Sequence, residues 1–164
     1  SPPQSGKTTL IRDIARQVSS GFSGFAGKKV GIIDERSEIA GCVQGVPQHD
    51  VGVRTDVLDA CPKAEGMMMM IRSMSPDLII VDEIGRQEDA AAILEARNAG
   101  VKVIATAHGN SLTEIAKRPS LSRLIQQQIF SRYILLSRNN GPGTIDQILD
   151  QNLAPLKAKG KRYA

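Results

Sequence analysis

The sequence contains no tryptophan, few other aromatic residues and two cysteines, and each shortage argues against a class of protein. Aromatic residues make up 3% of the 164 positions, so the chain offers few side chains on which the bases of single-stranded nucleic acid could stack. Cys42 and Cys61 belong to no Cys-x-x-Cys motif, so we expect free thiols rather than a zinc site or a disulfide framework. Apolar runs such as 67–71 and 78–81 are far shorter than the roughly 20 residues that a membrane-spanning helix needs.

An excess of one charge is also missing from most of the chain. The formal net charge is +4, from 21 basic and 17 acidic residues. Four of the basic residues lie close to the carboxyl terminus, with no acidic residue among them: Lys157, Lys159, Lys161 and Arg162. Without these four, the chain carries 17 charges of each sign. We therefore expect a neutral domain over 1–150 and a basic tail over 151–164. The tail is expected to be either a solvated segment or a remnant that is not native to the protein. Because the rest of the chain is neutral, a nucleic-acid partner is not favoured.

The hydrophobic pattern alternates short buried strands with helices, which is typical of an α/β domain with a mostly parallel sheet. The expected strands cover 29–34, 77–82 and 101–107, and the expected helices cover 7–18, 64–74, 88–98, 111–117 and 121–130. Pro119 is expected to end the fourth of these helices. Two short runs, 132–136 and 144–149, flank the sequence NNGPG and predict a β-hairpin. The stretch 37–62 shows little periodicity, and we expect it to be an irregular, functional segment.

The first residues predict a loop that binds phosphate. SPPQSGKT matches the pattern GxxxxGK[ST], except that Ser1 replaces the first glycine. Gly6 lets the backbone approach phosphate oxygens, Lys7 can reach the β- and γ-phosphates, and the Thr8 hydroxyl can hold Mg²⁺. The start of the following helix adds a positive dipole end. The expected nucleotide-binding residues are Pro3, Gln4, Ser5, Gly6, Lys7, Thr8 and Thr9.

A second motif, LIIVDEIG, places two acidic residues at the end of a hydrophobic strand. Such a strand delivers its carboxyl-terminal residues to the sheet edge where the phosphates bind. We expect Asp82 to position Mg²⁺ and Glu83 to polarise the attacking water as a general base. An exposed acidic strand end is the structural alternative. Together with the phosphate loop, the motif predicts binding and hydrolysis of ATP with Mg²⁺.

Two further motifs also follow expected strands. DERSEIAG brings Asp34, Glu35 and Glu38 together, and this cluster needs a cation from Mg²⁺, from Arg36 or from a neighbouring subunit. Glu35 is a catalytic candidate, with structural ion pairing as its alternative. In ATAHGNS, His108 lies just past a strand, where it can sense a γ-phosphate or orient water, or serve only a structural role.

Phosphoryl transfer also uses a cation that stabilises the developing charge, from the same chain or from a partner. The candidates are Arg36, Arg54, Arg86 and Arg132, any of which can instead be an ordinary surface residue. Arg54, in the irregular stretch GVRTD, is our first choice for a residue that acts on a partner subunit's site.

These motifs identify a family. The segments SPPQSGKTTLIRDIA, DERSEIAG, QGVPQHDVGVRTDVLDACPKAEGM, IIVDEIG and ATAHG closely resemble the stage III sporulation protein AA family of endospore-forming bacteria. That family is similar to a RecA-type branch of the secretion-system ATPases. In those ATPases the motifs are called Walker A, acidic box, Walker B and His box, and here they fall on 1–8, 34–38, 78–83 and 105–111. Two positions depart from the pattern: Asp82 where many members have glycine, and Arg36-Ser37 where a proline-containing pair is usual.

The resemblance implies a RecA-like P-loop NTPase. It further implies a ring, a hexamer, that hydrolyses ATP on the cytoplasmic face of a membrane channel between mother cell and forespore. In such a fold a strand precedes the phosphate loop and is central in the sheet, so we expect the chain to be truncated at its amino terminus. Alone, this chain is then expected to bind nucleotide weakly, to turn over poorly and to form no stable ring.

Two other functions fit part of the sequence. Related RecA-like ATPases act on single-stranded nucleic acid, and a salt-dependent affinity that survives deletion of 155–164 would favour that function. The alternative is a nucleotide-binding switch with little turnover, which the rate of phosphate release distinguishes from an ATPase.

Overall fold

The computed structural model of the chain describes residues 1–156, so the four basic residues of the expected tail lie outside the described part. Its helices are α1 (Lys7–Ser20), α2 (Lys63–Ser73), α3 (Gln87–Asn98), α4 (Leu112–Ala116) and α5 (Pro119–Gln126). Its strands are β1 (Val30–Asp34), β2 (Thr55–Asp59), β3 (Leu78–Val81), β4 (Lys102–Ala105), β5 (Arg132–Ser137) and β6 (Thr144–Asp150).

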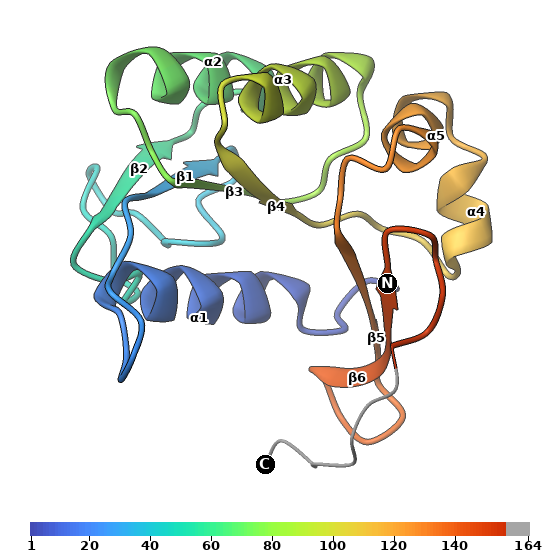
Figure 1. Ribbon diagram of the computed structural model, residues 1–164. Coiled ribbons are helices and arrows are strands. Elements are labelled where there is room, and N and C mark those ends of the chain that lie inside the picture. Colours follow the sequence, from blue (N-terminus) through green and yellow to red (C-terminus); the bar gives the residue numbers. More distant parts are fainter. Residues whose placement is uncertain (157–164) are drawn as a thin grey trace.

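The centre of the molecule is a four-stranded parallel sheet in the order β2-β1-β3-β4. Helices α2 and α3 cover one face of this sheet and α1 lies on the other (Figure 1). The strands β1 (VGIID) and β3 (LIIV) are buried along their whole length, because helices cover both of their faces. Strands β5 and β6 form a separate antiparallel hairpin. The expected α/β class, with its parallel sheet and carboxyl-terminal hairpin, is confirmed.

Alternate residues of the central strands supply two hydrophobic cores. Ile33, Ile79 and Val81 pack with the helices on the α2 and α3 side, where Met67 and Met70 are fully buried. Ile32 and Ile80 pack on the other side, against Ile11 and other residues of α1. This two-sided burial follows from the period of two in a strand, which sends successive side chains to opposite faces.

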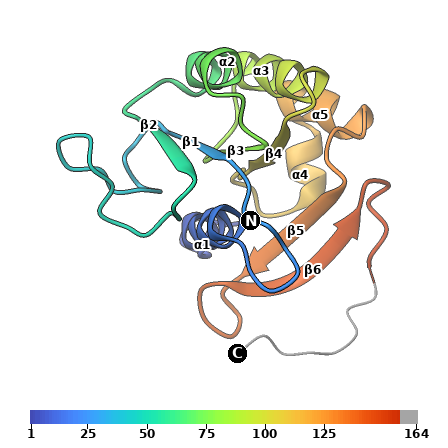
Figure 2. The ribbon, with the colours of Figure 1, turned by 60° about the vertical axis from the view of Figure 1, so that its left-hand side comes forward.

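The hairpin lies beside α1 (Figure 2), and it contacts the loop that precedes this helix. The Gly143 N–H donates a hydrogen bond of 2.9 Å to the Ser5 carbonyl. A Cβ atom at Gly6 would lie 2.8 Å from the Gly143 nitrogen, so the two backbones approach too closely for a side chain between them. After β6, residues 151–156 turn back, and the Leu156 N–H donates to the Ile148 carbonyl.

Three details differ from the sequence-based expectation. The stretch 37–62 was expected to be irregular, and this was wrong for Thr55–Asp59, which form β2 and pair with β1 along five residues. Pro119 does not simply end a helix: it is the first residue of α5, where its missing N–H costs nothing and its fixed φ suits the helix. The helix expected over 111–117 is present as the shorter α4.

An apolar groove of about 760 Å³ runs between β4, α1, α5 and β5. Ser1 lies at this groove: its nitrogen donates to the Ala107 carbonyl at 3.3 Å and its carbonyl accepts from the Gly109 N–H at 3.2 Å. These two bonds have the pattern of parallel strand pairing. The strand expected ahead of the phosphate loop stays a prediction. Within residues 1–156, no helix has the length and apolarity to cross a membrane.

Candidate active site

The loop before α1 has a backbone that can bind an anion. Gln4 and Gly6 adopt positive φ angles of 56° and 83°, which turn the chain sharply into the first turn of α1. The buried Ser5 hydroxyl closes this turn by donating 2.8 Å to the Pro2 carbonyl. The amino end of α1 therefore presents free backbone N–H groups and a positive dipole end to an anion.

Lys7 is buried at the start of α1, and its side chain curls back over the loop. Its Nζ donates to the carbonyls of Pro2 at 2.7 Å and Ser1 at 3.3 Å. A lysine ammonium has three donors, so one is left for a phosphate oxygen. Burial lowers the pKa of Lys7 below its ordinary value, and the nearby carboxylates of Asp82 and Glu83 oppose this shift.

The second motif meets the loop at the carboxyl end of β3. The Thr8 hydroxyl donates a hydrogen bond of 2.6 Å to Asp82 Oδ2, which joins positions 74 residues apart in the sequence. The other carboxylate oxygen, Oδ1, accepts from the Thr106 hydroxyl after β4 and from the Glu83 N–H at 3.0 Å. Asp82 thus receives donors from three segments, which fix its orientation toward the loop.

Glu83 stands on a strained turn between two basic side chains. Its φ of 53° lies in the left-handed region, which costs a non-glycine residue about 1–2 kcal/mol. Carboxylate oxygen Oε1 contacts His108 Nε2, and Oε2 lies 2.7 Å from a guanidinium nitrogen of Arg36. An ionised Glu83 carboxylate can accept a hydrogen bond here from the Nε2–H tautomer of His108.

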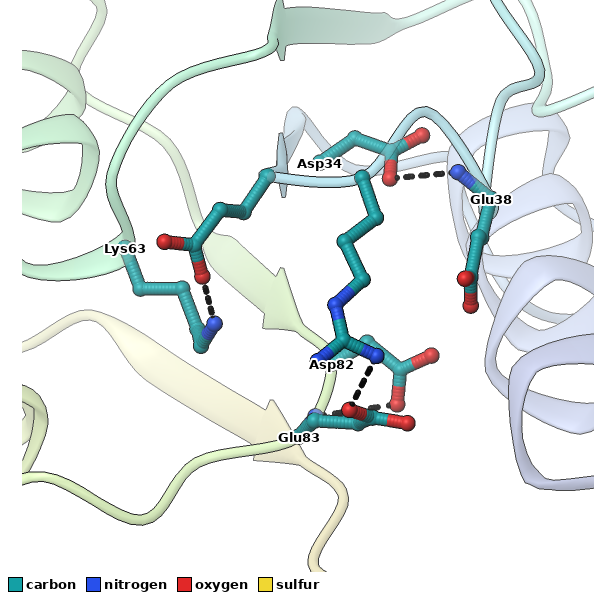
Figure 3. Close-up of a pocket in the computed structure, with 7 residues that line it drawn as sticks. Asp34, Glu38, Lys63, Asp82 and Glu83 are labelled. Carbon is teal, nitrogen blue, oxygen red and sulfur yellow. Dashed lines mark hydrogen bonds and ion pairs between the residues drawn. The ribbon is translucent and has the colours of Figure 1, made fainter. Parts of the chain in front are cut away.

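The acidic cluster after β1 separates into different roles. The buried Asp34 carboxylate accepts from the backbone N–H groups of Glu38, Ile39 and Ala40 at 2.8–3.0 Å, so it closes the loop that follows β1. The Glu35 carboxylate pairs with Lys63 at the start of α2. Figure 3 shows Asp34, Lys63 and Glu83 around one small cavity, which Glu35, Arg36, Glu38 and Asp82 also line.

Of the four candidate arginines, the structure brings Arg36 to the acidic residues. Arg54 precedes β2 and therefore lies at the amino-terminal end of the parallel sheet, whereas Asp82 follows the carboxyl end of β3. The Arg54 guanidinium donates 3.0 Å to the Ser19 carbonyl at the end of α1. Among residues 1–156, no hydrogen bond or ion pair joins Arg86 or Arg132 to these acids.

The donor set suits Mg²⁺ bound together with a nucleotide. Mg²⁺ in such sites takes one or two protein oxygens and completes its shell with phosphate oxygens and water. The hydroxyl of Thr8 and the carboxylate of Asp82, 2.6 Å apart, supply such oxygens. Residues 1–156 contain no group of three acidic, histidine or cysteine side chains that could hold a metal by itself.

Sequence reasoning missed two residues of this arrangement. Thr106 was part of the quoted motif ATAHGNS, but its hydroxyl was given no role; its place at a strand end, two positions before His108, was the available signal. Lys63 carried no signal, because its pairing with Glu35 depends on how α2 packs against the sheet.

The chain matches known proteins over nearly its whole length. The family model "Sporulation stage III, protein AA" covers residues 1–155. Stage III sporulation protein AA of Bacillus subtilis (strain 168) is 62% identical over 151 residues, which span 92% of this chain and 49% of that protein. The chain thus spans about half the length of this curated relative.

Among solved structures, the ATPase DotB of Legionella pneumophila has a similar fold, with a TM-score of 0.67, 22% identity and coverage of 93% of this chain and 44% of that one. The ATPase DotB of Yersinia pseudotuberculosis gives a TM-score of 0.59, 16% identity and coverage of 90% and 41%. At these identities, the likeness shows a shared fold. With the family model matching residues 1–155 and the 62% identity to the Bacillus protein, this chain belongs to the sporulation stage III protein AA family.

Proposed function

We propose that this chain is an ATPase domain that binds ATP with Mg²⁺ and hydrolyses it. The single observation that carries the proposal is the hydrogen bond of 2.6 Å between the Thr8 hydroxyl and Asp82, because it joins the phosphate loop to the acidic strand end. A structural role for either motif alone would not require this contact. The fold shared with two ATPases supports the proposal.

Each residue then has a chemical task. The backbone N–H groups of Gln4 to Thr9 surround the phosphates, Pro3 shapes the loop without donating an N–H, and the Lys7 ammonium contacts the β- and γ-phosphates. Thr8 and Asp82 hold the magnesium ion, which when bound neutralises charge on the phosphate oxygens. Glu83 accepts the proton of the attacking water, and His108 orients the Glu83 carboxylate from one side.

Glu35 has a weaker case for a catalytic role. It lines the same cavity as Glu83, but its carboxylate pairs with Lys63 at the start of α2. Both carboxylates pair with a cation, Glu35 with Lys63 and Glu83 with Arg36, so ion pairing does not rank them. Glu83 directly follows Asp82, which the Thr8 hydroxyl joins to the loop before α1. We therefore assign the general base to Glu83 and keep Glu35 as a secondary candidate.

The setting is proposed from the family. We expect the domain to work in a ring, a hexamer, on the cytoplasmic side of a membrane complex between mother cell and forespore during sporulation. Membership of the family and the fold shared with DotB support this setting. Arg54 lies far along the sheet from its own chain's acidic residues, so any catalytic action of Arg54 has to be on a neighbouring subunit.

Two substitutions test the ATPase assignment in the complete protein. Lys7→Ala is expected to lose nucleotide binding, whereas Glu83→Gln is expected to keep ATP bound but unhydrolysed. Phosphate release and the affinity for a fluorescent ATP analogue are the measurements. Lys28→Ala and Glu95→Gln change the same side-chain types at exposed positions and serve as controls. Turnover in Glu83→Gln equal to that of the unaltered protein would refute the general-base assignment.

Mixing variants tests the ring. Arg54→Ala and Lys7→Ala chains, each inactive alone, are expected to recover some turnover when mixed, because intact composite sites form between subunits. If mixed assemblies form and no ratio recovers activity, Arg54 does not act on a partner's site.

A further inference from the structure

We propose that Arg36 is a positioning residue for Glu83: its guanidinium holds the carboxylate in the orientation in which Glu83 accepts a proton from water. The inference rests on the proposed function. It gives Arg36, which lies where the sequence departs from the secretion-ATPase pattern, a role toward Glu83 of the same chain.

The Glu83 carboxylate is held from two sides by different segments. Arg36, from the loop after β1, lies 2.7 Å from Oε2, and His108, from the segment after β4, contacts Oε1. The Glu83 backbone is fixed as well, since its N–H donates to Asp82 Oδ1 at 3.0 Å and to Thr106 Oγ1 at 2.9 Å. An ionised carboxylate has about four lone-pair sites, so two donors still leave sites for a water molecule.

The loop that carries Arg36 is itself anchored on each side of this residue. Glu35 pairs with Lys63 of α2, and the Ser37 hydroxyl donates 2.6 Å to Asp59 at the end of β2. Asp34 accepts three backbone N–H groups of the same loop. With both sequence neighbours bonded to other elements, the Arg36 side chain is directed across the cavity to Glu83 (Figure 3 shows Glu83 on this cavity).

The exposure of Arg36 separates this role from a structural one. Its side chain is 62% exposed, whereas that of Glu83 is 23% exposed. An ion pair with one partner so exposed contributes little to folding, because solvent screens the charges. The loss of Arg36 should therefore appear in the turnover number and not in the stability of the fold.

The experiment compares Arg36→Ala and Arg36→Lys with Arg72→Ala in the complete protein. Arg72 is exposed in the last turn of α2, so its removal changes the net charge equally away from the cavity. We expect Arg36→Ala to lower kcat by about tenfold, since its loss frees the base without removing it. The dissociation constant of an ATP analogue and the unfolding temperature should stay the same. Arg36→Lys should restore part of kcat, and Arg36→Ala should add nothing to the loss caused by Glu83→Gln.

Three results would overturn the inference. Turnover of Arg36→Ala equal to that of the unaltered protein, with Glu83→Gln inactive, would show that Arg36 does not position the base. A parallel fall in ATP affinity would show that Arg36 contacts the nucleotide instead. If the unaltered protein binds ATP without hydrolysing it, the proposed function itself is wrong, and the role of Arg36 in positioning a base falls with it.

Discussion

Replacing Thr106 with valine removes the hydroxyl that joins the end of β4 to both acidic residues after β3. This hydroxyl donates to Asp82 Oδ1 and accepts from the Glu83 N–H at 2.9 Å, and Thr106 is only 8% exposed. Valine has nearly the same shape, so the substitution tests the hydrogen bonds with little change in packing.

The expected loss follows from what remains after the substitution. A hydrogen bond to a charged group contributes about 1.5–3 kcal/mol. Asp82 keeps its bonds from Thr8 at 2.6 Å and from the Glu83 N–H at 3.0 Å, so the lower end of that range applies. We expect the free energy of unfolding to fall by about 1.5 kcal/mol, which lowers the unfolding temperature of a domain of this size by about 4 °C.

Urea and thermal unfolding, followed by circular dichroism, measure this loss. Thr106→Ser keeps the hydroxyl and should stay within about 0.5 kcal/mol of the unaltered protein. In a double-mutant cycle with Asp82→Ala, most of the effect of Thr106→Val should disappear, because the charged partner is gone. A loss below about 0.5 kcal/mol, or an equal loss with and without the Asp82 carboxylate, would refute the reasoning.

Other predictions test the loop and its surroundings. Gly6→Ala should weaken ATP binding and should destabilise the fold more than Gly24→Ala does. Both glycines have φ near 80°, but of the two only Gly6 would place a Cβ against the hairpin. Equal effects of the two substitutions would contradict this. Because burial lowers the pKa of Lys7, ATP affinity should fall as the pH rises toward the ordinary lysine pKa of about 10.4, and Lys7→Arg should flatten that profile. In that pH range the folded chain binds fewer protons at Lys7 than the unfolded chain does. The free energy of unfolding of the unaltered protein should therefore rise with pH, measured against Lys7→Met, which lacks this titrating group. Asp34→Ala leaves three loop N–H groups without their acceptor and should lower the free energy of unfolding in urea by about 3 kcal/mol. The control Asp56→Ala, at an exposed position, should lower it little. A loss below about 1 kcal/mol for Asp34→Ala would show that Asp34 does not hold the loop closed.

Much of the site could be predicted because its parts are short and contiguous in the sequence. The phosphate loop and its helix follow directly from SPPQSGKT, since glycine, lysine and threonine at these spacings have few other uses together. The strand β3 is visible as LIIV, and a buried parallel strand places the residue after it at the sheet edge. The placement of Asp82 beside Thr8 was therefore within reach of the sequence.

The second strand could not be recognised in the same way. Strand β2 reads TDVLD and is only half-buried at the edge of the sheet, so its acidic residues hide the hydrophobic pattern. Its main partner is β1, with which it pairs in register from Thr55 to Asp59. Strand formation there depends on a neighbour that lies more than twenty residues earlier in the chain.

By itself, the sequence determined the fold class and the family, and it predicted the phosphate loop and the acidic strand end, because each depends on residues that are close along the chain. Only the tertiary structure decided which charges pair: Lys63 with Glu35, Arg36 with Glu83, and Arg54 with the end of α1 instead of the acidic cluster. The physical reason is that long charged side chains pair with whatever the packing of strands and helices brings within about 4 Å, and that proximity is a property of the folded chain.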